Sequence, residues 1–434
     1  MSGSWLAVQG RLPLAFMGLG LAWLVIATAL LVINAEVLAL PHTHPQVVAL
    51  THAWVLGFFV TVACGAVYQL APVALGTTLV NERHGWWHFG LHAFGVPGMV
   101  YAFWHWDLKL LGHYGFAVAL GILLFSVNTW RTVRRAGRRG TVAWSLALAA
   151  GWLLTTVLIG LLLAANRYWY FIPIDPLALL RAHAHVGLVG FFLTLLQGVG
   201  FQLVPMFTLG EVRNWRLANG GLWLSQAGLL GLTPAFVWHL TPLAQLSALA
   251  ITVGVVCSGV GLWRALATRK KRALDAGTQS FLRGGVGVAF ATAGGLALLF
   301  AGEGTSATGG FRAMFYAVLI VFGGLLPCLA GMMCKIVPFL TWMRAYGPRV
   351  GRGPTPSASA LANPRIERWG LALQGIATGP LLLGAWTLNR GWMLAGVWIL
   401  AAGVGLFVAD MFGVLRHLWV APAAPAGEKI PQTL

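Results

Sequence analysis

Long apolar runs separated by short polar segments recur along the whole of this chain. Each run has about 20 residues or more, the length that an α-helix needs to cross the hydrocarbon core of a bilayer. The pattern therefore predicts an all-α, polytopic membrane protein. Twelve transmembrane helices are expected, at residues 12–40, 46–72, 86–106, 110–130, 141–166, 180–207, 217–239, 242–266, 282–302, 311–342, 365–388 and 391–416.

The second and sixth predicted helices share a sequence pattern. Each matching residue in the sixth helix follows its counterpart in the second by the same number of residues, which is the separation of His52 from His185. We call this number the repeat offset. The stretch HAWVLGFFVTVACGAVYQLAP begins at His52, and HVGLVGFFLTLLQGVGFQLVP begins at His185. Shared apolar character does not explain the matching polar, glycine, aromatic and proline positions. The tenth helix is a weaker third copy, which keeps Gly323 and Pro338 in register but has Val318 in place of the histidine.

These copies predict a single integral membrane domain, residues 1–434, built from three pseudo-equivalent four-helix arcs. The repeats run approximately over 12–140, 141–275 and 276–418, and a flexible cytoplasmic tail is expected at 419–434. In the third copy Lys335 replaces the glutamine of the other two, near the cytoplasmic end. A long side chain at this depth is expected to snorkel towards the lipid headgroups.

Charged residues make up 9% of the chain, whereas a soluble domain carries about 25%, so the composition excludes a soluble protein. Of the 28 Lys and Arg residues, all but Lys109, Arg167, Arg181, Arg312 and Arg390 fall on one predicted side of the membrane. The positive-inside rule makes that side the cytoplasm, which predicts a bacterial inner-membrane protein with both termini cytoplasmic. The basic loops that give the chain its net charge of +18 then face the headgroups of the lipid bilayer, and no nucleic-acid partner is expected.

Histidines gather on the outer side, where the second and sixth helices begin. His183 and His185 are two residues apart, so their side chains point about 200° apart around the helix and address different neighbours. His52 occupies the position of His185 in the first copy. The segment LPHTHPQ adds His42 and His44 in a predicted loop, where they either bind copper or iron or form a solvated turn.

A second set of histidines, His84, His88 and His92, forms a stripe on the third predicted helix, towards the cytoplasmic side. Three ligands on one helix do not converge well on one ion. We therefore expect a quinone- or proton-handling face, or simple packing at the membrane interface beside Trp86 and Trp87.

Twelve spans in three arcs, with histidines near the outer ends of spans two and six, resemble subunit I of the heme-copper oxidase superfamily, which includes cytochrome oxidases and nitric oxide reductases. The resemblance implies that His52 is an axial ligand of a low-spin heme and that His185 binds copper or non-heme iron. It further implies an electron-donating partner, which is a cytochrome c-type or cupredoxin subunit or a quinol.

Two departures from that family matter. The seventh predicted helix lacks the family's histidine pair, and the tenth has Tyr316 and Val318 where the family has its His-x-His pair. A conventional binuclear centre that reduces oxygen is therefore not expected.

The sequence nevertheless favours a b-type heme held by His52 and either His183 or His185, because two imidazoles suit a six-coordinate iron. Arg181 and Arg167, at the same end, are expected to pair with the heme propionates. The absence of a CxxCH motif excludes a covalently attached c-type heme.

The expected function is electron transfer or a redox reaction of nitric oxide or oxygen, and whether the protein is an enzyme stays open. The alternative is a non-catalytic copper-handling, metal-handling or transport protein that uses the same outer histidines. A third hypothesis is a redox-silent assembly subunit without a cofactor.

Overall fold

A computed structural model of the chain describes residues 10–302, 306–351 and 353–420, with side chains left out for residues 306–311. Over these ranges the chain is helical and contains no strand. Most of the predicted tail, residues 421–434, lies outside the described residues. The predicted all-α class is confirmed.

Three long helices are each interrupted in the middle by a π-helical segment, and we call them the compound helices. They are α3 (Pro45–His52), η2 (Ala53–Val60) and α4 (Thr61–Leu75); α8 (Pro176–His185), η3 (Val186–Leu193) and α9 (Thr194–Thr208); and α13 (Ser306–Val318), η4 (Leu319–Leu325) and α14 (Leu326–Ala345).

The other long helices are uninterrupted. They are α2 (Arg11–Ile33), α5 (Glu82–His105), α6 (Leu108–Ala136), α7 (Thr141–Trp169), α10 (Trp215–Val237), α11 (Thr241–Ala267), α12 (Ala276–Ala301), α15 (Pro364–Thr387) and α16 (Arg390–Leu415). Short helical turns complete the described chain: η1 (Ala35–Ala39), η5 (Gly347–Arg349), η6 (Ala358–Leu361) and α17 (His417–Val420).

Among the described residues, nine helical segments are long and apolar enough to cross a membrane. Helices α5, α10 and α15 are 24, 23 and 24 residues long, which also exceeds the length needed, but they carry more polar residues. The first helix ends at Ile33 instead of residue 40. There Asn34 leaves the helical conformation and its side-chain amide donates to Leu30 O at 2.9 Å, which caps the helix end.

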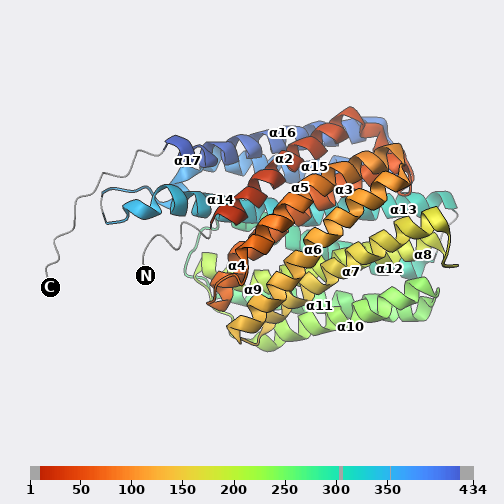
Figure 1. Cartoon of the computed structure of the whole chain (residues 1–434), viewed down its shortest axis with the longest axis horizontal. Helices are drawn as coiled ribbons and strands as arrows, with labels where there is room; N and C mark the ends of the chain where they lie inside the picture. Colours follow the sequence, from red (N-terminus) through yellow and green to blue (C-terminus); the bar gives the residue numbers. More distant parts are fainter. Residues whose placement is uncertain (1–9, 303–305, 352, 421–434) are drawn as a thin grey trace.

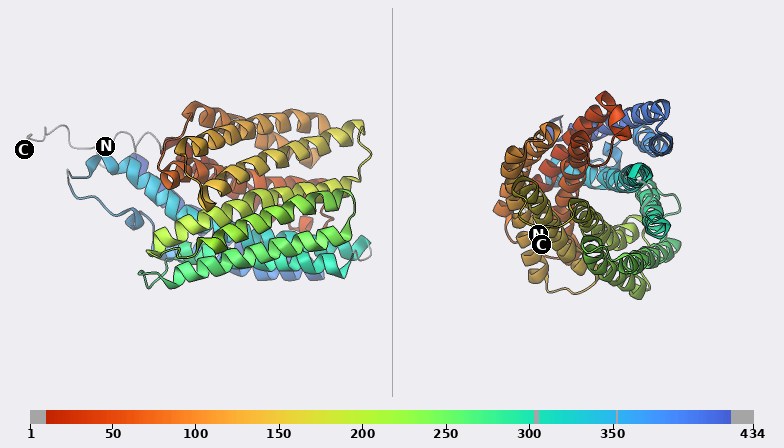
Figure 2. Two further views of the ribbon diagram at one scale, coloured as in Figure 1. Left: turned by 90° about the horizontal axis from the view of Figure 1, so that it is seen from below. Right: turned by 90° about the vertical axis from the view of Figure 1, so that its right-hand side faces the viewer.

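The helices run along the long axis of the molecule (Figure 1). Viewed along that axis, the chain winds once around the bundle, so that the first helix α2 packs against the last long helix α16 (Figure 2). The first helix of each group of four packs on the compound helix that follows it, namely α2 on η2 and α4, α7 on η3 and α9, and α12 on η4 and α14. The remaining pairs, α5 with α6, α10 with α11 and α15 with α16, pack against each other.

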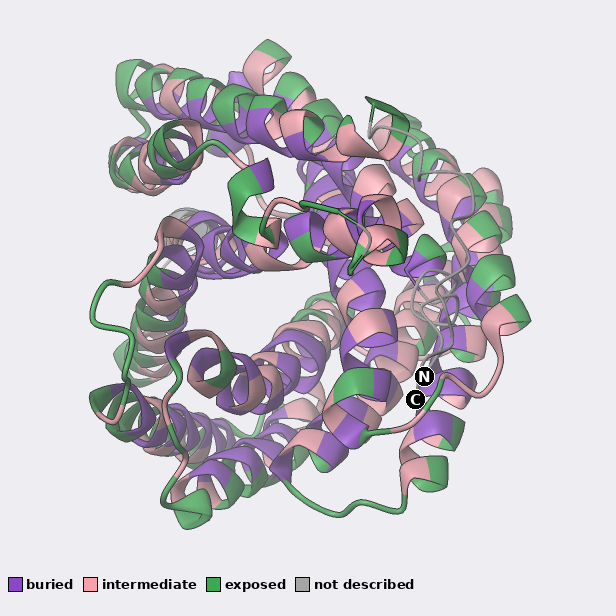
Figure 3. Ribbon diagram, turned by 90° about the vertical axis from the view of Figure 1, so that its left-hand side faces the viewer, coloured by how far each residue is buried: buried purple, intermediate pink, exposed green. Residues whose placement is uncertain are grey.

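Exposed residues line the outward faces of the bundle, and buried residues gather on the faces that helices turn towards each other (Figure 3). In their most apolar windows, 78%, 72% and 78% of the compound-helix residues are buried, against 22% for α7 and 17% for α12. In a membrane, such exposed apolar faces contact lipid. The central position of the compound helices places their side chains between neighbouring groups of helices.

The three π segments begin at Ala53, Val186 and Leu319, each one repeat offset after the one before. A π-helix widens the turn and leaves backbone carbonyls without their usual partner, so side chains supply one. Thr61 Oγ1 donates to Leu56 O at 2.9 Å, and Thr194 Oγ1 donates to Val189 O at 3.0 Å.

In the third compound helix the position of these threonines is held by Pro327, which has no hydroxyl to donate. The carbonyl equivalent to those of Leu56 and Val189 belongs to Phe322, and it accepts a hydrogen bond from Thr378 Oγ1 of α15 at 3.2 Å. Each π segment therefore has the same carbonyl satisfied by a threonine hydroxyl.

Candidate functional site

His52 is the last residue of α3, directly before the first π segment. Its Nδ1 lies 2.7 Å from Val48 O, and its ring stacks on Phe103 of α5 with the ring centroids 4.4 Å apart. Because a carbonyl oxygen only accepts, Nδ1 carries the proton and the lone pair is on Nε2. The half-buried ring thus presents a free nitrogen of the kind that ligates a metal.

His183 of α8 lies against α7, where its Nδ1 is 3.0 Å from Thr156 O. The same argument places its lone pair on Nε2. Gly160 of α7 makes room for the ring, since a Cβ at residue 160 would lie 3.0 Å from His183 Cε1. His183 is close enough to His52 for a charge on one ring to act on the other. The structure thus brings these two candidate ligands together from different compound helices.

His185, two residues further on, faces another part of the bundle. Its ring lies nearly parallel to Tyr316 of α13, 15° between planes with centroids 6.0 Å apart, and 5.0 Å from Phe236 of α10. Its Nδ1 is 2.8 Å from Arg181 O, which again leaves Nε2 with the lone pair. His183 and His185 therefore border different groups of helices.

The remaining predicted residues of the outer end differ in their surroundings. His44 caps α3, since its Nδ1 accepts from Gln46 N at 3.3 Å. His42 lies near Arg181, and burial, followed by the positive charge of Arg181, lowers the pKa of His42. Arg167 is exposed in the last turn of α7. Within the described ranges, no group of three or more His, Cys, Asp or Glu side chains is arranged to hold a metal ion.

A hydrogen bond from Nδ1 to the carbonyl four residues earlier does not by itself mark a ligand. His105 and His113 make the same bond, to Tyr101 O at 3.0 Å and Lys109 O at 2.7 Å, and both bonds are exposed. What distinguishes His52 and His183 is that a charge on one ring acts on the other, and that Thr156, on another helix, orients His183.

His88 and His92 of α5 form a second group, deep in the bundle, and both side chains are fully buried. His92 Nε2 lies 2.8 Å from Thr61 Oγ1 and 3.2 Å from Leu56 O, while His88 Nδ1 lies 3.0 Å from Tyr68 Oη. Since Thr61 donates its own proton to Leu56 O, His92 Nε2 must be the donor to both oxygens.

This group corrects the expectation of interfacial packing beside Trp86 and Trp87. Those two tryptophans are 40% and 68% exposed, whereas His88 and His92 point inward against α4. Each histidine also has one buried ring nitrogen without a partner, namely His88 Nε2 and His92 Nδ1.

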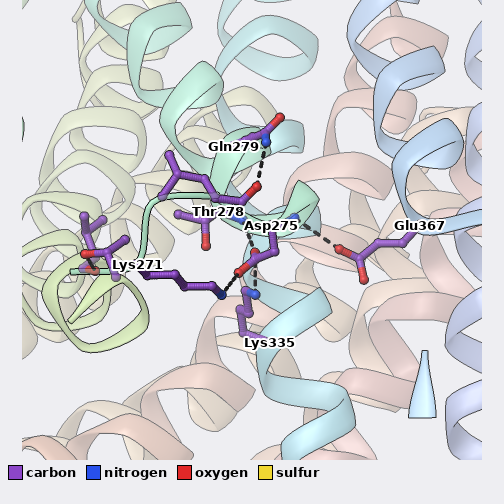
Figure 4. Close-up of polar contacts among 10 residues, drawn as sticks. Lys271, Asp275, Thr278, Gln279, Lys335 and Glu367 are labelled. Carbon is purple, nitrogen blue, oxygen red and sulfur yellow. Dashed lines mark hydrogen bonds and ion pairs between the residues drawn. The ribbon is translucent and has the colours of Figure 1, made fainter. Parts of the chain in front are cut away.

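Lys335 does not snorkel towards the headgroups but forms an ion pair with Asp275, the residue that caps α12 (Figure 4). Glu367 lies on the other side, where its Oε1 accepts from Gly277 N at 3.2 Å. Burial alone would raise the pKa of the Asp275 carboxyl, but hydrogen bonds from Lys335, the Thr278 N–H and Lys271 hold that pKa well below its usual range. Asp275 and Lys335 are far apart in the chain, so no local pattern in the sequence predicts this pair.

Asp410 of α16 lies within the same end of the bundle and is 4% exposed. Its Oδ1 accepts from Asn363 N at 2.7 Å, whereas Oδ2 is buried without a hydrogen-bond partner. The hydrogen-bond partner of Asp410 is distant in the sequence, because Asn363 precedes α15, the helix that packs against α16.

Comparison with known proteins identifies the architecture. No family model and no curated protein matches the chain. Among solved structures, a heme-copper terminal oxidase, determined as a dimer, is similar at 13% sequence identity with a TM-score of 0.62, over 92% of this chain and 84% of that one. The chain has a heme-copper oxidase subunit I-like fold. The fold that the sequence resemblance implied is thereby confirmed, as is a multi-pass membrane protein.

Proposed function

We propose that this chain is a heme-binding integral membrane protein that works in electron transfer or in a redox reaction of nitric oxide or oxygen. The observation that carries the proposal is that His52 and His183, two half-buried imidazoles on different compound helices, lie within electrostatic range of each other, each with its Nδ1 on a backbone carbonyl and its lone pair on Nε2. These two nitrogens would hold the iron of a b-type heme, which would supply one-electron chemistry.

The surrounding residues favour this role. Val48 O and Thr156 O fix the tautomer and orientation of the two rings, which is how oriented histidine ligands are supported in metal sites. Phe103 holds the plane of the His52 ring by stacking. Arg181 and Arg167, at the same end of the bundle, would pair with the propionates.

A conventional oxygen-reducing centre is not part of the proposal. Helix α10 contains no histidine, and α13 has Tyr316 and Val318 where a histidine pair would be needed. Tyr316 instead lies against His185, and the side chains that flank this histidine are aromatic. The proposed function is therefore electron transfer, or a redox reaction of nitric oxide or oxygen that uses no second metal beside the heme iron.

The membrane setting follows the same reasoning. We propose twelve spans in three pseudo-equivalent arcs, with both termini in the cytoplasm of a bacterium and a cytochrome c-type or cupredoxin subunit or a quinol as electron partner. The π segments that recur at the repeat offset, and the repeated packing of one helix on each compound helix, support the arcs and the boundaries 12–140, 141–275 and 276–418.

An absorption spectrum of the purified protein, oxidised and dithionite-reduced, tests the proposal. We expect a Soret band that is lost in His52→Ala and in His183→Ala. His105→Ala and His113→Ala are matched controls for His52→Ala, because they remove the same kind of intrahelical hydrogen bond at exposed positions. A wild-type protein without a Soret band, or a His52→Ala variant with an unchanged one, would contradict heme ligation.

The metal-handling alternative has weaker support. His42 and His185 are the additional candidates, but both lie near the positive charge of Arg181, which opposes a cation between them. Metal analysis separates the two hypotheses, since copper bound stoichiometrically without heme would favour the alternative.

A further inference from the structure

A cavity of about 50 Å³ lies between the three compound helices, at the level of α4, α9 and α14, which follow the π segments. Its lining includes one pair of residues from each helix: Val62 and Ala66 of α4, Leu195 and Val199 of α9, and Cys328 and Met332 of α14. The two residues of every pair are four apart, and successive pairs are related by the repeat offset. The three copies therefore turn the same helix face towards one shared space on their pseudo-threefold axis.

All residues that line this cavity are apolar. The Cys328 thiol is already engaged, with its Sγ 3.5 Å from Phe281 O. A buried water molecule needs two to four polar partners, and apolar cavities without them stay dry and take up apolar guests. The chemistry of the lining thus selects an uncharged, apolar occupant over water.

The volume limits the size of that occupant. A cavity of about 10–15 Å³ holds one water molecule, and benzene enters an apolar cavity of about 150 Å³. A cavity of about 50 Å³ therefore accommodates a molecule of one or two heavy atoms but no ring. The first copy contributes smaller side chains to the lining than the second, because Ala63 and Ala66 stand where the second copy has Leu196 and Val199.

We propose that this axial cavity is a binding site for a small apolar gas, a diatomic molecule in the cell and xenon as an experimental probe. Val62 follows His52 by ten positions, which places the cavity roughly 15 Å further along the same helix. The gas site is thus separate from the outer histidines and needs no cofactor to form.

Anomalous diffraction from crystals of the full chain pressurised with xenon tests the proposal directly. We expect a xenon atom between α4, α9 and α14. Ala66→Leu should abolish this peak by filling the cavity. Val73→Leu is the matched control, because Val73 lies on the same helix but is 59% exposed, and its peak should be unchanged.

A variant that enlarges the cavity keeps the proposal testable if Ala66→Leu fails to fold. Met332→Ala removes side-chain volume from the lining and should raise xenon occupancy at a given pressure. Ala63→Val is a smaller filling change that should lower it. No xenon at the axis in the wild type, or equal xenon in Ala66→Leu, overturns the proposal.

A Soret spectrum of the same preparations keeps this inference distinguishable from heme binding. Xenon at the axis of a protein without a Soret band would support the gas site and remove the heme proposal. A Soret band without axial xenon would do the reverse.

Discussion

The first two compound helices and the third share one shape but differ in their chemistry. All three widen into a π segment at the same place, yet the first two begin that segment after a histidine and the third begins it after Val318. The same carbonyl is satisfied from within the helix by Thr61 and Thr194, but from a neighbouring helix by Thr378.

This difference shows that the widened turn does not depend on the histidines. In the third copy Thr378 of α15 supplies the hydroxyl for the same carbonyl, and this copy carries Lys335 and its ion pair at the other end. The shape of the bundle and the placement of reactive side chains are thus specified by different residues.

The largest expected effect separates the two histidines of the second copy. His183→Ala should abolish heme binding, whereas His185→Ala should retain it, because His185 faces Tyr316 and Phe236 instead of the side of His52. Heme content by the pyridine hemochrome spectrum, normalised to protein, measures this. Heme loss in His185→Ala with retention in His183→Ala would reverse the assignment.

The ion pair of the third copy should come next in magnitude. Lys335→Met is expected to lower the free energy of unfolding by about 3 kcal/mol, because it leaves the partly buried Asp275 carboxylate with one ionic partner fewer. Lys271→Met is the control, since Lys271 bonds the same carboxylate from a side chain that is 45% exposed and should cost below about 1 kcal/mol. Denaturant unfolding in detergent compares the two, and equal costs would argue against a special role for Lys335.

The π-segment threonines of the first two copies should differ from each other. Thr194→Val leaves the buried Gln226 amide, which donates to Thr194 Oγ1 at 2.7 Å, without an acceptor and should cost about 2 kcal/mol. Thr61→Val should cost about 1 kcal/mol, because His92 Nε2 keeps its bond to Leu56 O. Thermal unfolding of both variants measures the difference, and a larger loss in Thr61→Val would contradict this account.

The smallest effect is expected from pH. The pKa of Asp275 is lower in the folded protein than in the unfolded chain, so its contribution to stability is complete above about pH 5 and is lost as the pH falls towards the folded-state pKa. One such group accounts for below about 1 kcal/mol between pH 4 and pH 3. Unfolding measured at both pH values should show a smaller change in Asp275→Asn than in the wild type, and an equal change would exclude this carboxyl as the source.

The fold and the register of the repeats were accessible from the sequence, because the length of the apolar runs and the repeat offset can be read directly along the chain. The choice of His183 as the neighbour of His52 was not, since two residues on opposite helix faces are equivalent until the surrounding helices are placed. Lys335 with Asp275 and His88 with Tyr68 join different helices, and their pairing depends on how those helices pack.

The matched π segments also carry a constraint on how this chain can change. Deleting one residue from a single segment would turn every later side chain of that helix by about 100°. Val62 and Ala66, or their counterparts, would then swing away from the axis while the other two helices kept their faces there. Length changes at these sites are therefore tolerated only when all three helices change together, whereas point substitutions in one copy, such as Val318 for a histidine, are free to accumulate.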